Sequence, residues 1–253
     1  RKEEGEEDIL NLTRCAWAGS QRYGALVWTG DVYSDFNSLR NQIAAGMNMG
    51  LSGIPWWTTD IGGFHGGNVA SPEFRECLVR WFEFGAFCPV FRLHGFRNPI
   101  VTDPEEMVFT GKNAKEWKYT SGSPNEVWSY GEEVYQICEK YLKLREKMRP
   151  YINEQMKLAH EKGTPVMRPL FFDYPEDAKA WEIEDQYMFG PDILVAPVVY
   201  EGTREREVYL PEGEWVQIHS KDTFTGGQKI VCKAELDEIP VFVKREKEEI
   251  FDE

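Results

Sequence analysis

The sequence predicts an α/β fold followed by a small antiparallel β domain. Strand-like and helical segments alternate over about the first two thirds of the chain, and short strands separated by turn residues fill the rest. Residues 53–59 are apolar at consecutive positions, which is typical of a parallel strand buried on both faces. With 253 residues, of which 42% are hydrophobic, the chain is large enough to build such a core.

Two strands and a helix begin the α/β part. Residues 9–17 mix β-branched and apolar residues and predict a strand, and residues 25–28 predict a second, short one. Apolar residues then recur at four-residue spacing over residues 35–51, which predicts an amphipathic helix capped by Ser34 or Asp35. With the buried strand that follows, this order is that of a β/α unit, in which neighbouring strands run parallel.

A second helix and a long loop region come next. Ser71 and Pro72 are typical of a helix start, and the helix is predicted to end near Phe87. Residues 88–125 are rich in Gly, Pro, Asn and Thr and predict a loop insertion, which at this length usually serves a function. Two further helices are predicted, at residues 126–148 and 151–162.

The last part of the chain changes from alternating helices and strands to strands alone. Residues 165–172 predict the fourth strand of the α/β part. The antiparallel strands that follow are expected at residues 193–200, 206–210, 214–218, 229–232 and 241–244. We therefore divide the chain into residues 1–188, the α/β part, and residues 189–253, the β domain. Four β/α units do not close an eight-stranded barrel, so the sheet is either open or the second half of a barrel.

Composition limits the classes of partner. The chain has 29 basic and 43 acidic side chains and a net charge of −14, which argues against nucleic acid. No apolar stretch is long enough to span a bilayer, so we expect no membrane partner. Five cysteines without metal-ligand spacing, and the lack of an apolar signal at residues 1–8, favour the cytoplasm, although the location stays open. We expect no metal and no cofactor.

Two acidic residues follow strand-like segments. Asp31 comes shortly after the strand at residues 25–28, and Asp60 directly follows the strand at residues 53–59. Because parallel strands deliver residues at their carboxyl ends to one face, the two carboxyl groups are expected on the same face. Paired carboxyl groups suit the cleavage of glycosidic bonds. From the local sequence alone, however, a helix-cap role for Asp31 is favoured.

Four motifs are informative together: Trp28-Thr29-Gly30-Asp31, Asp60-Ile61-Gly62-Gly63-Phe64, Phe91-Arg92-Leu93-His94 and Gly190-Pro191-Asp192-Ile193-Leu194-Val195-Ala196-Pro197-Val198. With them the chain resembles glycoside hydrolase family 31, the retaining α-glucosidases and α-xylosidases, over nearly its whole length. The resemblance implies that the four units are strands five to eight of a TIM (β/α)8 barrel and that a β-sandwich domain follows them.

The resemblance also implies roles for the acidic residues. Asp31 would be the general acid/base, whose carboxyl must carry a proton near neutral pH before it acts. The nucleophilic aspartate of the family lies on strand four, which has no counterpart here, so it is expected upstream of Arg1. Asp60 would shape the pocket and pair with Arg92 rather than attack the sugar.

The remaining candidates are expected to bind the substrate. By the resemblance, Arg14 would lie against the sugar hydroxyls and the nucleophile, and His94 would contact a hydroxyl of the sugar beside the cleavage point. Trp28 and Phe64 belong to an aromatic cluster around the two acids, and aromatic faces pack on the C–H surface of sugars.

The predicted function is therefore that of part of a retaining α-glycosidase. It would hydrolyse terminal α-linked glucosides or xylosides from oligosaccharides through a covalent glycosyl-enzyme intermediate. Besides this substrate, the expected partner is the missing N-terminal half of the same enzyme, without which the isolated chain is expected to be inactive. The alternative is a catalytically incomplete fragment that acts only as a carbohydrate-binding or structural module.

Overall fold

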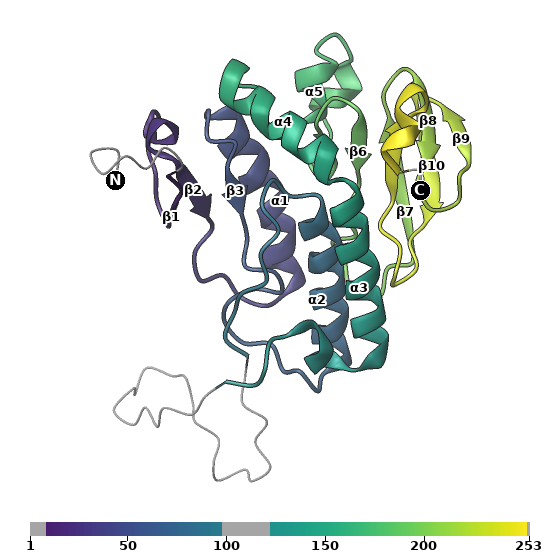
Figure 1. The fold of residues 1–253 in the computed structure, drawn as a ribbon. Helices are drawn as coiled ribbons and strands as arrows, with labels where there is room; N and C mark the ends of the chain where they lie inside the picture. The colour runs from purple at the N-terminus through teal and green to yellow at the C-terminus, as the bar shows by residue number, and fades with distance from the viewer. Residues whose placement is uncertain (1–8, 98–121, 252–253) are drawn as a thin grey trace, which may run out of the picture.

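The computed structural model describes residues 9–97 and 122–251 (Figure 1). Three strands form a parallel sheet in the order β1-β2-β3, namely β1 (Asn11–Thr13), β2 (Ala25–Trp28) and β3 (Trp57–Thr58). Helix α1 (Phe36–Leu51) connects β2 to β3, so the predicted strand-helix-strand order is confirmed. The strands at the first and third positions are shorter than predicted.

The outer strand of this sheet leaves apolar side chains in solvent. Within the described residues, β1 pairs with β2 alone. Leu12 on β1 is 48% exposed, and Trp17, which follows the strand, is 82% exposed. An uncovered strand edge of this kind is a ready-made surface for pairing with another strand.

Helix α1 begins at a cap that the sequence predicted. The side chain of Asp35 accepts a hydrogen bond from the backbone N–H of Ser38 at 2.7 Å, so Asp35, and not Ser34, is the N-cap. A side chain at Gly50 would lie 2.7 Å from the carbonyl oxygen of Met167. Because glycine has no Cβ, α1 can approach that backbone closely.

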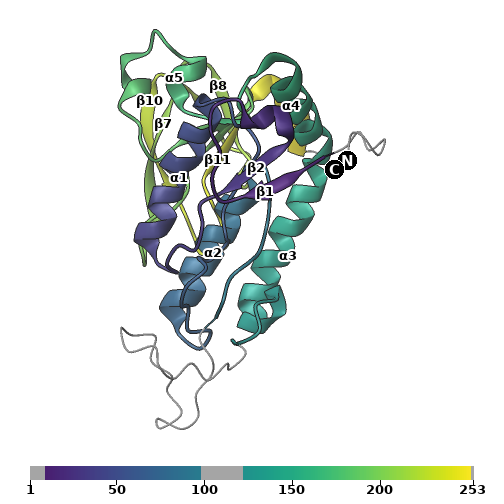
Figure 2. The ribbon, with the colours of Figure 1, turned by 90° about the vertical axis from the view of Figure 1, so that its left-hand side faces the viewer.

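The other long helices pack together beside the parallel strands. Helix α2 (Pro72–Ala86) has Ser71 as its N-cap and proline in its first turn, as predicted. A 3-10 turn, Val127–Tyr130, leads into α3 (Glu132–Lys147), and α4 (Arg149–Lys162) follows. Figure 2 is viewed from the side of β1 and β2 and shows α1, α2 and α3 behind them. No helix in residues 9–97 and 122–251 is long and apolar enough to cross a membrane.

The predicted fourth strand of the α/β part is wrong. Residues 165–172 instead contain β4 (Met167–Arg168), which pairs antiparallel with β5 (Tyr187–Phe189), and the short helix α5 (Leu170–Asp173). The segment that lies along β3 begins at Val90, whose N–H donates to the carbonyl of Trp57 at 3.1 Å. A short apolar run predicts a strand but not the strand that it pairs with, because it would be buried in the parallel sheet and in the antiparallel sheet alike.

The antiparallel domain is confirmed. Its larger sheet has the order β4-β5-β6-β11-β8-β9, and β7 (Glu205–Leu210) pairs separately with β10 (Gln228–Lys233). The remaining members are β6 (Ile193–Val195), β8 (Glu214–Gln217), β9 (Thr223–Thr225) and β11 (Val241–Lys244). Strand β5 runs across the division that the sequence suggested between residues 188 and 189, and that division stays a prediction. A division between α4 and β4 would keep the six-stranded sheet in one unit.

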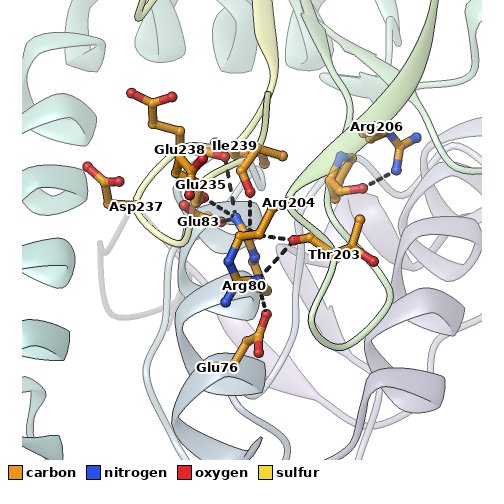
Figure 3. Close-up of polar contacts among 12 residues, drawn as sticks. Glu76, Arg80, Glu83, Thr203, Arg204, Arg206, Glu235, Asp237, Glu238 and Ile239 are labelled. Carbon is orange, nitrogen blue, oxygen red and sulfur yellow. Dashed lines mark hydrogen bonds and ion pairs between the residues drawn. The ribbon is translucent and has the colours of Figure 1, made fainter. Parts of the chain in front are cut away.

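A buried arginine on α2 connects the two parts of the molecule (Figure 3). Arg80 and Glu83 are both 0% exposed and form an ion pair at 3.1 Å. The Arg80 guanidinium also donates to main-chain carbonyl oxygens of the β domain, at Thr203, Ala234, Glu235 and Glu238. Burial raises the pKa of Glu83 to about 7, although the positive charge of Arg80 acts in the opposite direction. The two parts therefore share a fully buried polar contact.

Candidate active site

Three neighbouring strands each deliver a charged side chain to the same edge of the parallel sheet. Arg14 directly follows β1, Asp31 comes three residues after β2, and Asp60 comes two residues after β3. Because the strands run parallel, these positions all lie at the carboxyl ends of the strands. In barrels of β/α units this is the edge that carries active sites.

Asp31 pairs with an arginine and is open to solvent. Its Oδ2 lies 2.6 Å from Nη2 of Arg14, and the two side chains are 36% and 55% exposed. The helix-cap role that the local sequence favoured belongs to Asp35 instead. The carboxyl group of Asp31 is therefore free of the helix and accessible to a ligand.

Asp60 is buried against a second arginine. Its side chain is 0% exposed and forms an ion pair with Nη2 of Arg92, as predicted. Burial raises the pKa of Asp60, the nearby charge of Asp31 acts in the same direction, and Arg92 and His94 act against both. Oδ2 of Asp60 and Nε of Arg92 are buried and have no hydrogen-bond partner among the described residues.

Trp28 lies between the two ion pairs. The guanidinium carbon of Arg14 is 5.8 Å from the centroid of its ring, and that of Arg92 is 5.9 Å away. Both arginines are thus within the range of cation–π attraction to one indole. Of the two later tryptophans, Trp57 is in the core, 6.4 Å from Phe84 between ring centroids, whereas Trp56 remains partly exposed. Trp28 is the tryptophan that joins the predicted site residues.

The last two candidates contact each other. The rings of Phe64 and His94 are 5.6 Å apart between centroids and tilted by 37°. Phe64 also meets His65 edge to face at 4.9 Å. The structure therefore brings all seven predicted site residues to one edge of the sheet, as two ion pairs joined by Trp28 and an aromatic contact beside Asp60.

The sequence did not point to Arg97, which connects the loop that follows β2 to the loop that follows β3. Its side chain is 0% exposed and donates to Oγ of Ser34 at 3.2 Å and to the carbonyls of Ile61 at 3.0 Å and Gly63 at 2.8 Å. These acceptors lie in the loops that follow β2 and β3. An arginine inside a loop-like stretch gives no signal in one sequence, because its acceptors are backbone atoms from other segments.

Gly63 allows the same two loops to touch. It adopts a φ of +74°, and a side chain there would lie 2.5 Å from the carbonyl oxygen of Tyr33. Only glycine takes this conformation freely and leaves room for the neighbouring backbone. The described residues contain no group of three or more His, Cys, Asp or Glu that could hold a metal ion. The site thus offers an accessible carboxyl group, two guanidinium groups and aromatic faces, which suit a ligand rich in hydroxyl groups.

Two family models match the chain in succession. The model described as "Glycosyl hydrolases family 31 TIM-barrel domain" matches residues 1–155, and that described as "Glycosyl hydrolase family 31 C-terminal domain" matches residues 163–247. These matches confirm the predicted fold class, part of a TIM barrel followed by a β domain.

Named relatives and a solved structure that are similar to this chain point to the same family. An alpha-xylosidase of Saccharolobus solfataricus is 39% identical over 95% of this chain and 30% of its own length. Alpha-glucosidase 2 of Bacillus thermoamyloliquefaciens is 36% identical over 95% of this chain and 28% of its own length. The crystal structure of a GH31 alpha-xylosidase from a soil metagenome complexed with xylose is 55% identical, with a TM-score of 0.87 over 96% of this chain and 36% of that chain. The chain thus spans about a third of the length of these relatives.

The family model for the barrel alone covers more than half of the 253 residues. Together with the strand-end site and the separate match of the β domain, this shows that the chain belongs to glycosyl hydrolase family 31.

Proposed function

We propose that this chain is part of a retaining α-glycosidase that releases terminal α-linked glucose or xylose from oligosaccharides. The observation that carries the proposal is the accessible Asp31 carboxyl group, paired with Arg14 at the carboxyl edge of the parallel strands of a family 31 chain. Relatives named alpha-xylosidase and alpha-glucosidase support the substrate class, and they leave the choice between the two sugars open.

In this proposal Asp31 works as the general acid and then as the general base. It donates a proton to the leaving oxygen, and after the glycosyl-enzyme has formed it removes a proton from the attacking water. Arg14 lies at hydrogen-bonding distance from Asp31 and holds its carboxylate form in place between the two steps. Trp28 and Phe64 offer apolar faces to the sugar, and Arg92 and His94 donate to its hydroxyls.

The nucleophile is proposed to come from a segment of the complete protein outside this chain. A retaining mechanism needs a second carboxyl group about 5–5.5 Å from the first. Asp60 suits that role poorly because it is buried and engaged by Arg92, so we assign it to shaping the pocket. Three parallel strands do not close a barrel, which takes eight, and the uncovered edge of β1 offers the pairing surface for the remainder.

A non-catalytic role is the second candidate, for the chain in isolation. The observation that favours it is that the chain spans only about a third of the relatives' length, and the proposed nucleophile is expected outside that span. Under this alternative the isolated residues bind α-glycosides weakly and hydrolyse none of them.

The test is Asp31→Asn in the complete protein that contains this chain. Hydrolysis of a natural α-linked disaccharide should fall by more than about 100-fold, because the leaving sugar needs a proton. Hydrolysis of an aryl α-glycoside with a good leaving group should fall less. Asp35→Asn is the matched control, since asparagine also caps helices well and Asp35 lies four residues away. Full activity of Asp31→Asn on the disaccharide would refute the acid/base assignment.

A further inference from the structure

Four aromatic rings form a continuous row that leads out of the candidate site. Successive ring centroids are 5.6 Å apart from His94 to Phe64, 4.9 Å from Phe64 to His65 and 6.0 Å from His65 to Tyr33. The inner end is near Asp60, since burial raises the pKa of that carboxyl group and the charge of His94, after that of Arg92, opposes this rise. We call Tyr33 and His65 the outer pair of this aromatic row.

Backbone hydrogen bonds fix the outer pair in place. The N–H of Ser34 donates to the carbonyl of His65, and the N–H of His65 donates to the carbonyl of Val32, both at 3.0 Å. Tyr33 and His65 thereby form an isolated parallel bridge between the loops that follow β2 and β3. The contact at Gly63 brings the same loops together. The main chain therefore holds Tyr33 and His65 side by side, and their rings meet across this bridge.

The outer pair is open to solvent. Tyr33 is 69% exposed and His65 is also exposed, whereas Phe64 is partly covered. Two stiff rings with polar tips are suited to a sugar, because the ring faces pack on its C–H surface and the phenol and imidazole hydrogen-bond to its hydroxyls.

The position of Tyr33 indicates whether the outer pair would contact the sugar that is cleaved off or the sugar of the leaving group. Tyr33 follows Asp31 by two residues, which span at most about 7 Å of extended chain. A general acid touches the oxygen that departs with the leaving group, so side chains on its own loop flank that group. The proposed function places Phe64 and His94, at the inner end of the row, beside the sugar that is cleaved off.

We propose that Tyr33 and His65 bind the leaving-group sugar of an α-linked oligosaccharide and thereby make the enzyme prefer oligosaccharides to simple glycosides. This inference rests on the proposed glycosidase function and adds the side chains that contact the sugar on the leaving-group side of the scissile bond.

The experiment compares two substrates that share the same terminal sugar in the complete protein. One is an α-linked oligosaccharide, and the other is the α-glycosyl fluoride, whose leaving group contains no sugar. Tyr33→Ala and His65→Ala should each lower kcat/KM on the oligosaccharide by about 3- to 10-fold, mainly through a higher KM. Turnover of the fluoride should stay within about twofold of wild type. Tyr23→Ala is the matched control, because Tyr23 is also 69% exposed and lies at the opposite end of β2.

The outcomes separate the inference from the function beneath it. Equal losses on both substrates, or no loss on either, would overturn the role of the outer pair while the fluoride activity of the wild type upholds the glycosidase. A wild-type protein that hydrolyses neither substrate would overturn the proposed function and this inference with it. Thermal unfolding of each variant, expected at the wild-type temperature for exposed positions, shows whether a loss arises from misfolding.

Discussion

His219 is a histidine that the fold keeps neutral. It lies beside α3, with its ring 6.5 Å from that of Tyr141, and its Nε2 is buried without a hydrogen-bond partner among the described residues. Burial, followed by the positive charge of Lys140, lowers its pKa from 6.5 to about 4, while Asp237 acts in the opposite direction. The folded state therefore takes up this proton less readily than the unfolded chain, and His219 destabilises the fold as the pH falls from 6.5 towards 4.

Replacement of His219 by leucine should remove this pH dependence. Between pH 7 and pH 4 the wild-type chain is expected to lose up to about 3 kcal/mol more unfolding free energy than His219→Leu. Urea denaturation at constant ionic strength measures the difference. His160→Leu, at an exposed position on α4, should follow the wild type. Parallel pH curves for wild type and His219→Leu would contradict the assignment.

Single residues show what one sequence can and cannot reveal about the site. The positions of Asp31 and Asp60 after neighbouring strands were predictable because the apolar runs before them mark the strand ends, and their roles stay predictions. The assignment of Asp35 as the helix cap was predictable only as a choice between two neighbours. Arg97 was not predictable, since its acceptors are carbonyl oxygens brought together by the tertiary fold.

Helix α1 contains two glycines, Gly46 and Gly50, that pack against the segment around β4 and have different nearest neighbours. A Cβ at Gly50 would lie 2.7 Å from the backbone carbonyl oxygen of Met167 and 2.8 Å from Cβ in the ring of Pro165, neither of which can rotate away. At Gly46 the nearest atom, also at 2.7 Å, is the sulfur of Met167, which belongs to a flexible side chain, and the Trp57 ring comes next at 3.0 Å. Alanine has a higher helix propensity than glycine and would favour the helix at both positions by up to about 1 kcal/mol. The severity of the clash therefore decides whether each substitution stabilises or destabilises the chain.

Gly50→Ala should therefore destabilise the chain by about 1–3 kcal/mol, because rigid backbone must move to admit the methyl group. Gly46→Ala should cost clearly less, because the Met167 side chain can change rotamer. Chemical denaturation of the two variants beside wild type measures both effects. Equal losses, or a larger loss at Gly46, would mean that the β4 backbone yields more easily than the methionine.

Whole elements were predicted best where the pattern was long. Helices α1 and α2 were expected nearly to the residue, because spacing and caps agreed. The strand at residues 165–172 was assigned to the wrong sheet, and β5 and β9 were not predicted at all. Strands of two or three residues carry too little periodicity to specify a partner, so their place depends on contacts that are distant in sequence.

At the scale of the whole molecule, the buried Arg80–Glu83 pair joins α2 to the β domain (Figure 3). Arg80→Ala should lower the unfolding free energy by about 3–5 kcal/mol, because Glu83 would remain buried without its partner and four carbonyl groups would lose a donor. Chemical denaturation measures the loss. The matched control is Arg149→Ala, which removes an arginine–glutamate pair of the same three-residue spacing whose side chains are 65% and 62% exposed. That change should cost less than about 1 kcal/mol, and similar losses in both variants would show that burial adds nothing to the Arg80 contact.

The arrangement of the two parts could be predicted only in outline. Alternation of segments indicated an α/β part followed by a β domain, and the motifs indicated which end of the strands carries the site. The contact between the parts could not be predicted, because Arg80 lies in an apolar helix and its partners are more than 120 residues away.

Arg80 contacts the backbone of the β domain and not its side chains. Its four acceptors there are main-chain carbonyl oxygens, which every amino acid supplies. The contact with Arg80 therefore depends on the course of the loops around residues 203 and 234–238, whereas the ion pairs of Arg204 with Glu76 and of Asp237 with Lys140 depend on their side chains. A β domain with other side chains at these four positions would keep the hydrogen bonds to Arg80, whereas an insertion of one residue in either loop would move the carbonyl oxygens away from the guanidinium.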